Sequence, residues 1–250
     1  MLSDAEIKYY EKMQEHEEEE REKVPKIVFK YRSLKGTLNF DRVLDIVKNN
    51  RLYMPAVKEL NDPFEGRNVA VEHLPAEAYD RLENWRTEHR VLSLSATCFS
   101  TLMWANYASE EDGVSIGFYS NDSFSGMEPI EYLNDNTDKQ WLAFEDSCVH
   151  HFDFKYKSKD WAYEEEYRIE SDYSKYLSFN HDEIACVVVG ENLNEEVRNI
   201  LLVELEQEEI PILNLKKDYD KKKYYVVPNT NPSKKIYGME DLEQYLCESK

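Results

Sequence analysis

The segment from Trp161 to Arg168 places two glutamates and an arginine within five residues of one another. If the chain is extended from Tyr163, alternate side chains share a face, so Glu164, Glu166 and Arg168 point the same way. Two carboxylates and a guanidinium are costly to bury unless each group is paired or takes part in chemistry. The spacing therefore predicts a candidate site at this segment.

Two carboxylates at this spacing suit cleavage of a glycosidic bond, in which positive charge develops on the sugar. The nicotinamide of NAD already carries a positive charge and leaves without a general acid. One carboxylate can then stabilise the ribosyl cation while the other orients an acceptor. Arg168 and Lys157 can bind the pyrophosphate, and Tyr31 or Trp161 can stack on the nicotinamide ring. The pattern alone favours a plainer interpretation, a strand face whose charges form weak ion pairs.

The charge of the chain limits its partners. Its 250 residues contain 31 lysines and arginines against 51 aspartates and glutamates, a net charge of −20. Such a field repels nucleic-acid backbones and anionic membranes, so we expect no non-specific nucleic-acid binding and no membrane partner. The negative net charge does not exclude an anionic ligand bound in a locally basic pocket. Without an apolar leader or a membrane-length apolar run, the sequence predicts a soluble, cytoplasmic protein.

No metal site is predicted. The four cysteines are widely spaced and lack the paired pattern of zinc ligands, which favours reduced thiols; they are Cys98, Cys148, Cys186 and Cys247. The chain also lacks a glycine-rich phosphate loop, an H-E-x-x-H motif and a G-x-S-x-G motif.

The remaining sequence predicts one α+β domain over residues 26–250, with a mixed β-sheet, split or continuous, flanked by helices. Residues 1–25 form a highly charged helical extension, which is either a partner-binding arm or, more simply, a solvated helix. Hydrophobic periodicity predicts strands near residues 27–33, 52–54, 92–98, 114–118, 130–132, 184–189, 210–215 and 224–227. It predicts helices near residues 3–23, 40–50, 75–85, 101–107, 138–152, 194–208 and 239–247.

Six blocks of sequence, in order, carry a resemblance to a known family. They are Lys30-Tyr-Arg-Ser33, Asn61-Asp-Pro-Phe-Glu65, Cys98-Phe-Ser100, Leu102-Met-Trp-Ala-Asn-Tyr-Ala108, Gly113-Val-Ser-Ile-Gly-Phe118 and Lys157-x-x-x-Trp161-x-x-Glu164-x-Glu166-x-Arg168. Over residues 27–215 the chain resembles the bacterial domain of unknown function 2971 family, whose members are often encoded near phage-defence genes. The family's residues fall on Tyr31, Arg32, Asn61, Asp62, Trp104, Tyr107, Lys157, Trp161, Glu164, Glu166 and Arg168.

A weaker resemblance is to the ADP-ribosyltransferases. Their early-strand arginine, middle-strand serine and late E-x-E motif fall on Arg32, Ser100 and Glu164-x-Glu166, although the middle block lacks the usual Ser-Thr-Ser. The resemblance implies NAD as a substrate, with Glu166 catalytic and Glu164 orienting the acceptor. It also implies cofactor contacts at Arg32 and Ser100. If NAD is the substrate, we expect the cofactor contacts to include Tyr31, Tyr107, Lys157, Trp161 and Arg168 as well, with Arg32 and Arg168 as the phosphate-binding or structural pair.

Three hypotheses stay open at this point. The first is an ADP-ribosyltransferase-like protein in bacterial defence or toxin function, transferring ADP-ribose from NAD to an unknown protein or nucleic-acid acceptor. The second is a non-catalytic module that senses a nucleotide or a phage protein through the same pocket, with its acids all held in ion pairs. The third is a magnesium-dependent nuclease using Asp62 with Glu164 and Glu166, although Arg168 and the negative charge argue against it. Asn61 and Asp62 are either ligand contacts or a structural turn.

Overall fold

The computed structural model describes residues 24–62, 76–133 and 156–249. The predicted helix over residues 3–23 and the helix predicted from Asp138 lie outside these ranges, so the amino-terminal extension stays a prediction. Of the turn predicted over residues 61–65, only Asn61 and Asp62 are described.

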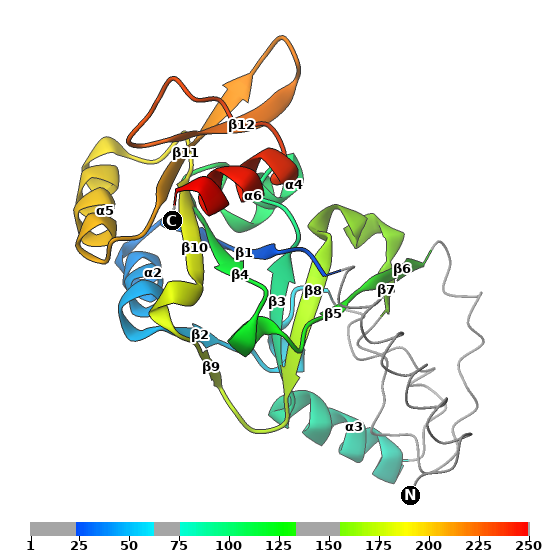
Figure 1. The fold of residues 1–250 in the computed structure, drawn as a ribbon. Helices are drawn as coiled ribbons and strands as arrows, with labels where there is room; N and C mark the ends of the chain where they lie inside the picture. Colours follow the sequence, from blue (N-terminus) through cyan, green and yellow to red (C-terminus); the bar gives the residue numbers. More distant parts are fainter. Residues whose placement is uncertain (1–23, 63–75, 134–155, 250) are drawn as a thin grey trace, which may run out of the picture.

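A mixed eight-stranded sheet forms the centre of the fold (Figure 1), in the order β12-β11-β10-β4-β1-β3-β8-β5. Neighbouring strands are antiparallel except β10 and β11, which are parallel. The strands are β1 (Ile27–Ser33), β3 (Arg90–Ser95), β4 (Gly113–Tyr119), β5 (Glu128–Pro129), β8 (Glu166–Ser171), β10 (Ile184–Val189), β11 (Ile212–Asp218) and β12 (Lys223–Pro228).

Two small sheets and a set of helices surround this sheet, which confirms the predicted α+β class. The small sheets pair β2 (Arg51–Tyr53) with β9 (Tyr176–Ser178), and β6 (Glu131–Leu133) with β7 (Tyr156–Ser158). The helices are α2 (Thr37–Asn49), α3 (Ala76–Glu88), α4 (Thr101–Tyr107), α5 (Glu195–Gln207) and α6 (Met239–Glu248). Short 3-10 helices cover Val57–Glu59, Asp122–Phe124, Lys159–Glu164 and His181–Glu183.

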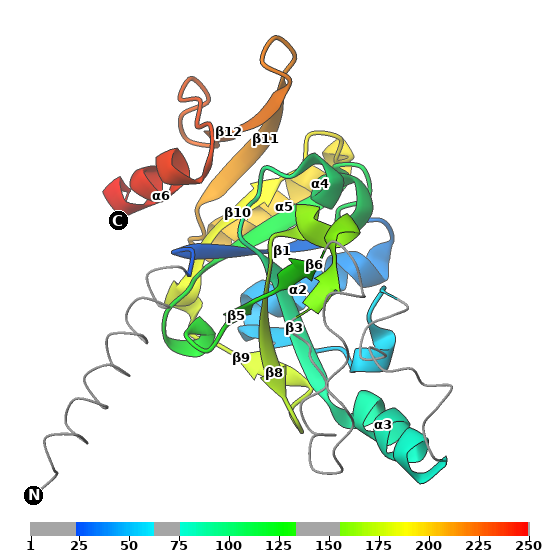
Figure 2. The same ribbon diagram turned by 90° about the vertical axis from the view of Figure 1, so that its right-hand side faces the viewer.

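Helices lie on both faces of the sheet (Figure 2), and apolar residues pack beneath them on each face. One face carries Val28, Ile116 and Val187 and packs against α2 and α5, whereas the other packs against α4 and α6. The continuous apolar run of β10 is buried at all six positions, as predicted for a strand covered on both sides.

The sheet is split between β1 and β3. β1 pairs with β4 along its whole length, from Ile27 opposite Tyr119 to Ser33 opposite Gly113. Between β1 and β3, only Phe29 and Ser95 are paired. β3 instead pairs along its length with β8, and Figure 2 shows β1 and β3 crossing steeply. The residues of β1 after Phe29 therefore face an opening in the sheet.

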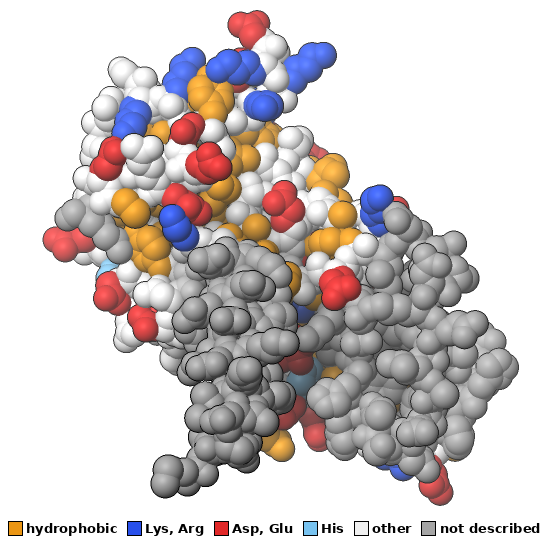
Figure 3. Space-filling model, turned by 45° about the vertical axis from the view of Figure 1, so that its right-hand side comes forward, with side chains coloured by type: hydrophobic (Ala, Val, Ile, Leu, Met, Phe, Trp, Pro, Cys, Tyr) orange, Lys and Arg blue, Asp and Glu red, His pale blue; other side chains and the backbone are white. Residues whose placement is uncertain are grey.

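The surface of the described residues is unevenly charged (Figure 3). Acidic side chains are scattered over the visible face, while lysines and arginines gather at the end where Figure 1 places the β11–β12 hairpin. Within residues 24–62, 76–133 and 156–249, no helix combines the length and apolar character needed to span a bilayer.

Candidate functional site

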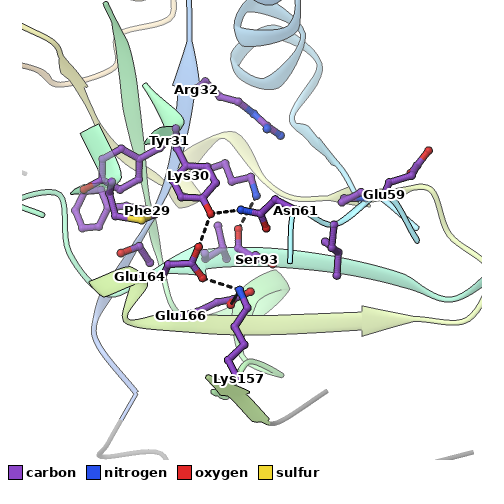
Figure 4. Close-up of a pocket in the computed structure, with 16 residues that line it drawn as sticks. Phe29, Lys30, Tyr31, Arg32, Glu59, Asn61, Ser93, Lys157, Glu164 and Glu166 are labelled. Atoms are coloured by element: carbon purple, nitrogen blue, oxygen red, sulfur yellow. Dashed lines mark hydrogen bonds and ion pairs between the residues drawn. The ribbon is translucent and has the colours of Figure 1, made fainter. Parts of the chain in front are cut away.

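A cavity of about 240 Å³ occupies the opening between β1 and β3 (Figure 4). Five parts of the chain that are distant in sequence contribute its polar lining. They are Lys30 and Arg32 from β1, Glu59 and Asn61 from the segment after β2, Ser93 and Ser95 from β3, Tyr107 from α4, and Lys157, Glu164 and Glu166 from β7 to β8. The predicted convergence of the early arginine with the late E-x-E is therefore present in the structure.

On one side of the cavity, two glutamates share one lysine. Lys157 Nζ lies 2.6 Å from Glu164 Oε2 and 2.8 Å from Glu166 Oε2. Arg168 Nε donates to Glu166 Oε1 at 2.7 Å, and all four side chains are buried. We call these four residues the ion-pair cluster. Each carboxylate is held by at least one buried cation, which satisfies the requirement for burying charge.

The backbone that positions the two glutamates differs from the predicted one. Residues Lys159–Glu164 form a 3-10 helix, and Glu165 has φ 44° and ψ 53°, the left-handed region. The strand begins only at Glu166, so the prediction of extended chain from Tyr163 was wrong for its first three residues. The Glu165 carbonyl accepts from the backbone N–H of Ala96 at 2.9 Å, which fixes this turn against the end of β3. Glu164 reaches the cavity through the turn, not through strand alternation.

The two glutamates have different proton affinities. Burial raises the pKa of Glu166, but the charges of Arg168 and Lys157 outweigh it and lower the pKa to about 2. Burial raises the pKa of Glu164 above its ordinary value, because the attraction of Lys157 does not compensate fully. Glu166 is thus the fixed anion of the pair, and Glu164 is the one that takes up a proton more readily.

A chain of hydrogen bonds connects Glu164 to the rim of the cavity. The Tyr107 hydroxyl donates to Glu164 Oε1, and Asn61 Nδ2 donates to the Tyr107 hydroxyl. Tyr107 is half-buried and Asn61 is exposed. Asn61 thus lines the cavity, whereas Asp62, its buried neighbour, does not.

On the other side of the cavity, β1 presents two cations at alternate positions. Lys30 Nζ donates to the Ser93 carbonyl at 2.6 Å. Neither Lys30 nor Arg32 forms an ion pair with a carboxylate of the described residues, and Arg32 Nε is buried with no hydrogen-bond partner. Glu164 and Glu166, on the opposite wall, are already paired with Lys157 and Arg168. Glu59, which also lines the cavity, lies 3.6 Å from Arg90. The two cations of β1 therefore lack a carboxylate partner among the described residues.

Desolvation disfavours the charged forms of Lys30 and Arg32 and so lowers their pKa values. Desolvation, together with the charge of Arg32, lowers the pKa of Lys30 to about 7. Desolvation and the nearby Arg42 of α2 lower the pKa of Arg32 to about 10, so Arg32 stays charged at neutral pH. An anion bound between them would supply the missing counter-charge.

Tyr31 lines the cavity but is fixed in the core. It is 4 % exposed, and its hydroxyl donates to the Thr97 carbonyl at 2.9 Å. Its ring meets Trp104 edge to face, with centroids 5.3 Å apart. Trp104 itself is fully buried and belongs to the core on the α4 side of the sheet.

Three predicted contacts, Ser100, Trp161 and Arg168, are not among the residues that line the cavity; Arg168 lies behind Glu166 in the ion-pair cluster. Ser100 instead caps α4: its Oγ accepts from the Met103 N–H and donates to the Tyr163 carbonyl at 3.1 Å. The ring centroid of Trp161 lies 5.1 Å from Lys157 Nζ, so this residue supports the ion-pair cluster through a cation–π contact.

Four polar residues of the cavity were not among the predicted site residues: Lys30, Glu59, Ser93 and Ser95. For three of them a signal was present in the sequence. Lys30 stands two residues before Arg32 and therefore shares its face of β1, and Ser93 and Ser95 alternate with the apolar Leu92 and Leu94.

The geometry gives no support to the magnesium-nuclease hypothesis. Lys157 occupies the position between Glu164 and Glu166 where a shared cation would be needed, and Asp62 does not line the cavity. Across the described part of the chain, no group of three or more His, Cys, Asp or Glu residues is arranged to hold a metal ion.

Comparisons with known proteins give one match. A family model described as "Protein of unknown function (DUF2971)" matches residues 103–169. This segment is narrower than the predicted 27–215 and includes most of α4, Lys157 and the E-x-E-x-R motif, but not β1. No curated protein and no solved structure matches the chain, and none of the comparisons points to the ADP-ribosyltransferases. The chain is thus similar to the DUF2971 family over the segment that supplies the acidic wall of the cavity.

Proposed function

We propose that the chain binds a small phosphate-bearing molecule in the cavity between β1 and β3. The observation that carries the proposal is the pair Lys30 and Arg32, two part-buried cations on one wall with no carboxylate partner among the described residues. In a chain of net charge −20, two neighbouring cations without a carboxylate partner are not a by-product of composition.

The chemistry of the lining narrows the ligand class. Arginine binds phosphate oxygens in a bidentate fork and lysine acts as a point charge, so the pair suits a phosphate or diphosphate group. Ser93, Ser95, Asn61 and Tyr107 offer hydrogen bonds to sugar hydroxyls. Ligand pockets for drug-sized molecules measure about 300–1,000 Å³. At about 240 Å³ the cavity fits a sugar phosphate, or one half of a dinucleotide, better than a whole dinucleotide.

The state of the acids favours binding without catalysis. Glu166 is paired with both Arg168 and Lys157, and Glu164 is held by Lys157 and by the Tyr107 hydroxyl. This is the arrangement expected of the non-catalytic nucleotide-sensing module. A role in phage defence follows from the family resemblance alone and belongs to the proposal.

Calorimetric titration with pyrophosphate, ADP and ADP-ribose at pH 6.5 tests the proposal. We expect saturable binding to wild type and a loss of about 10- to 100-fold in Lys30→Met or Arg32→Gln, the range for one charged hydrogen bond. Affinity should also fall from pH 6 to pH 8, because Lys30 loses its proton in that range. Lys35→Met, at an exposed position just after β1, is the matched control. Equal binding by wild type and both cavity variants would contradict the proposal.

A second candidate is the transfer of ADP-ribose from NAD. It is favoured by the order β1-β3-β8, which brings Arg32, Glu164 and Glu166 to one cavity from adjacent strands and the turn before β8. The ribose–nicotinamide C–N bond would break and its electron pair would leave with neutral nicotinamide. The acceptor would bond to the same carbon, and its proton would pass to Glu164, whose raised pKa suits a base. Glu166 would stabilise the ribosyl cation, and the phosphates would contact Lys30 and Arg32.

Nicotinamide release separates the two candidates. Wild type is incubated with NAD labelled in the nicotinamide ring, beside Glu164→Gln and Glu166→Gln. Release that depends on both glutamates supports the transferase, whereas binding of NAD or ADP-ribose without release supports the sensing module. Release unchanged by Glu166→Gln would remove Glu166 from the mechanism.

A further inference from the structure

The β11–β12 hairpin projects from the body of the protein. β12 is the edge strand of the large sheet and pairs with β11 from Leu213 opposite Pro228 to Asp218 opposite Lys223. Figures 1 and 2 both show its turn extending beyond the sheet and the flanking helices. We call residues 216–237, which comprise the outer half of the hairpin and the segment after it, the lysine–tyrosine segment.

This segment reverses the charge of the rest of the chain. It contains seven lysines and two aspartates, a net charge of +5, so the remaining residues carry −25. Figure 3 shows the concentration of basic side chains at this end of the molecule. Exposed charges are screened beyond about 8 Å at physiological ionic strength. A partner at the turn therefore meets mainly the local positive charge.

Several of these lysines are available for a partner. Lys222, Lys223 and Lys235 are exposed and form no ion pair with the described residues, and Lys221 lies 4.0 Å from Asp218, a weak contact. The lysines nearer the body are engaged: Lys216 pairs with Glu191 at 3.3 Å, Lys217 with Glu111 at 2.6 Å and Lys234 with Glu248 at 3.8 Å.

Tyrosine rings lie among the available lysines. Tyr219, in the turn, is 81 % exposed. Tyr225 and Tyr237 lie with ring centroids 5.2 Å apart; Lys221 Nζ is 3.8 Å from the Tyr237 centroid and Lys235 Nζ is 4.9 Å from that of Tyr225. The exposed ring of Tyr219, close in sequence to Lys221, Lys222 and Lys223, can stack on a base while these lysines contact the neighbouring phosphates.

Protection of the sheet edge does not account for the lysines of the lysine–tyrosine segment. Lysines on an edge strand discourage pairing with another sheet. Here, however, the available lysines lie in the turn, at the first residue of β12 and after the strand, whereas Tyr224–Val227 along the edge contains none.

We propose that the lysine–tyrosine segment binds a single-stranded polynucleotide. The lysines supply phosphate contacts and Tyr219 supplies a stacking surface, which an acidic protein partner would not require. The site is separate from the cavity and does not depend on the function proposed for it. It also limits the prediction from net charge, because repulsion of nucleic acid by the acidic body need not extend to this projecting turn.

Fluorescence anisotropy of a labelled 20-nucleotide oligo-dT, titrated with the full chain, tests the proposal. Four lysine–phosphate contacts on a single strand give a log–log salt slope of about −2.8, an affinity loss of about 50-fold between 50 and 200 mM NaCl. The triple variant Lys221→Gln, Lys222→Gln, Lys223→Gln should reduce the slope to about −0.7. Tyr219→Ala should weaken binding by about 10-fold while leaving the slope unchanged.

The matched control replaces three exposed lysines outside the segment, Lys35, Lys58 and Lys175, with glutamine. This control has the same net charge as the hairpin triple variant and should bind as wild type does. Equal losses in the two triple variants would assign binding to overall charge and overturn the proposal. Absence of oligo-dT binding at 50 mM NaCl, or tighter binding of poly-glutamate than of oligo-dT, would also overturn it.

Discussion

Charged Lys30 is expected to favour ligand binding but to lower the stability of the fold. Its ammonium is buried beside Arg32, and its pKa of about 7 lies below the ordinary 10.5. The unfolded chain therefore binds this proton more tightly than the folded chain does. The charged form costs stability, most fully below pH 7, and the cost disappears as the pH rises toward 10.5.

Lys30→Met should consequently make the protein more stable while it weakens ligand binding. We expect the free energy of unfolding to rise by about 1 kcal/mol or more at pH 6, as when other buried charges are replaced by apolar side chains. The gain should shrink at pH 9.5. Urea denaturation at the two pH values measures it, with the exposed Lys35→Met as control. A loss of stability at pH 6 would show that Lys30 is held by attraction, against the argument above.

Glu166 presents the opposite case, a buried acid whose charge stabilises the fold. Its pKa is about 2, so its contribution is present above the ordinary value of 4.5 and is lost as the pH falls through 4.5 toward 2. Glu166→Gln leaves Arg168 and Lys157 without their shared anion and should cost about 3 to 5 kcal/mol at pH 7.

The test of this prediction compares urea unfolding of wild type and Glu166→Gln at pH 7, 4.5 and 3. The difference between them should narrow as the pH falls, because the unfolded wild-type chain then takes up a proton at Glu166 that the folded chain does not. Glu165→Gln, at the exposed neighbouring position, should be close to wild type throughout. A difference that stayed constant with pH would indicate a packing defect rather than lost charge.

At the scale of elements, the sequence predicted where individual strands lie, but not which strands pair with one another. Alternation located β1, β3 and β4, and the apolar run located β10, because side-chain period depends only on local sequence. That β1 leaves β3 after the single pair Phe29 and Ser95 depends on long-range pairing. The cavity therefore could not be derived from periodicity alone.

The turn before β8 is a second feature that could not be predicted from the sequence. Glutamate is not a residue type that signals a left-handed conformation, so Glu165 gave no warning that a 3-10 helix ends there. Glu164 was nevertheless assigned to the cavity. By contrast, the resemblance pointed to Ser100, which does not line the cavity. Ser93 and Ser95 do line it, and their alternation with apolar residues already placed them on one face of β3.

His89 joins the end of α3 to the outer part of the β8 strand and the residue after it. Its ring nitrogens lie 2.9 Å from Asp172 Oδ1 and 3.0 Å from Glu170 Oε2, and the ring stacks on Trp85. Burial lowers the pKa of His89, but the hydrogen bonds to Glu170 and Asp172 outweigh it and the net pKa is raised above 6.5. The stabilisation is therefore complete below pH 6.5 and is lost as the pH rises through the raised value.

His89→Gln should cost about 1 to 2 kcal/mol at pH 6, a typical value for charged hydrogen bonds, and less at pH 9. Hydrogen exchange of the last turn of α3 should accelerate with it, because the helix end loses its attachment. His181→Gln serves as control, since that ring contacts Asn50 Oδ1 and the Glu208 carbonyl and no carboxylate. Equal pH profiles for the two variants would contradict the assignment.

At the scale of the whole molecule, charge is segregated and not spread evenly. The −20 total combines an acidic body with two places of excess positive charge, the cavity wall at Lys30 and Arg32 and the lysine–tyrosine segment. A single net charge describes none of these surfaces. It does describe the self-repulsion that acts on the folded state as a whole, since a large net charge opposes the compact form.

Salt should therefore stabilise the protein. Raising NaCl from 20 to 300 mM screens repulsion among exposed acids, while buried pairs such as Lys157 with Glu166 are screened much less. We expect the melting temperature to rise by about 2 to 4 °C, which corresponds to about 1 kcal/mol for a chain of this size.

Chloride bound at Lys30 and Arg32 would also stabilise the fold, and the variant Lys30→Met distinguishes screening from chloride binding. Screening acts equally on wild type and variant, whereas specific anion binding disappears with the lysine. A fall in melting temperature with salt would mean that attractive surface pairs outweigh the repulsion of the acidic body.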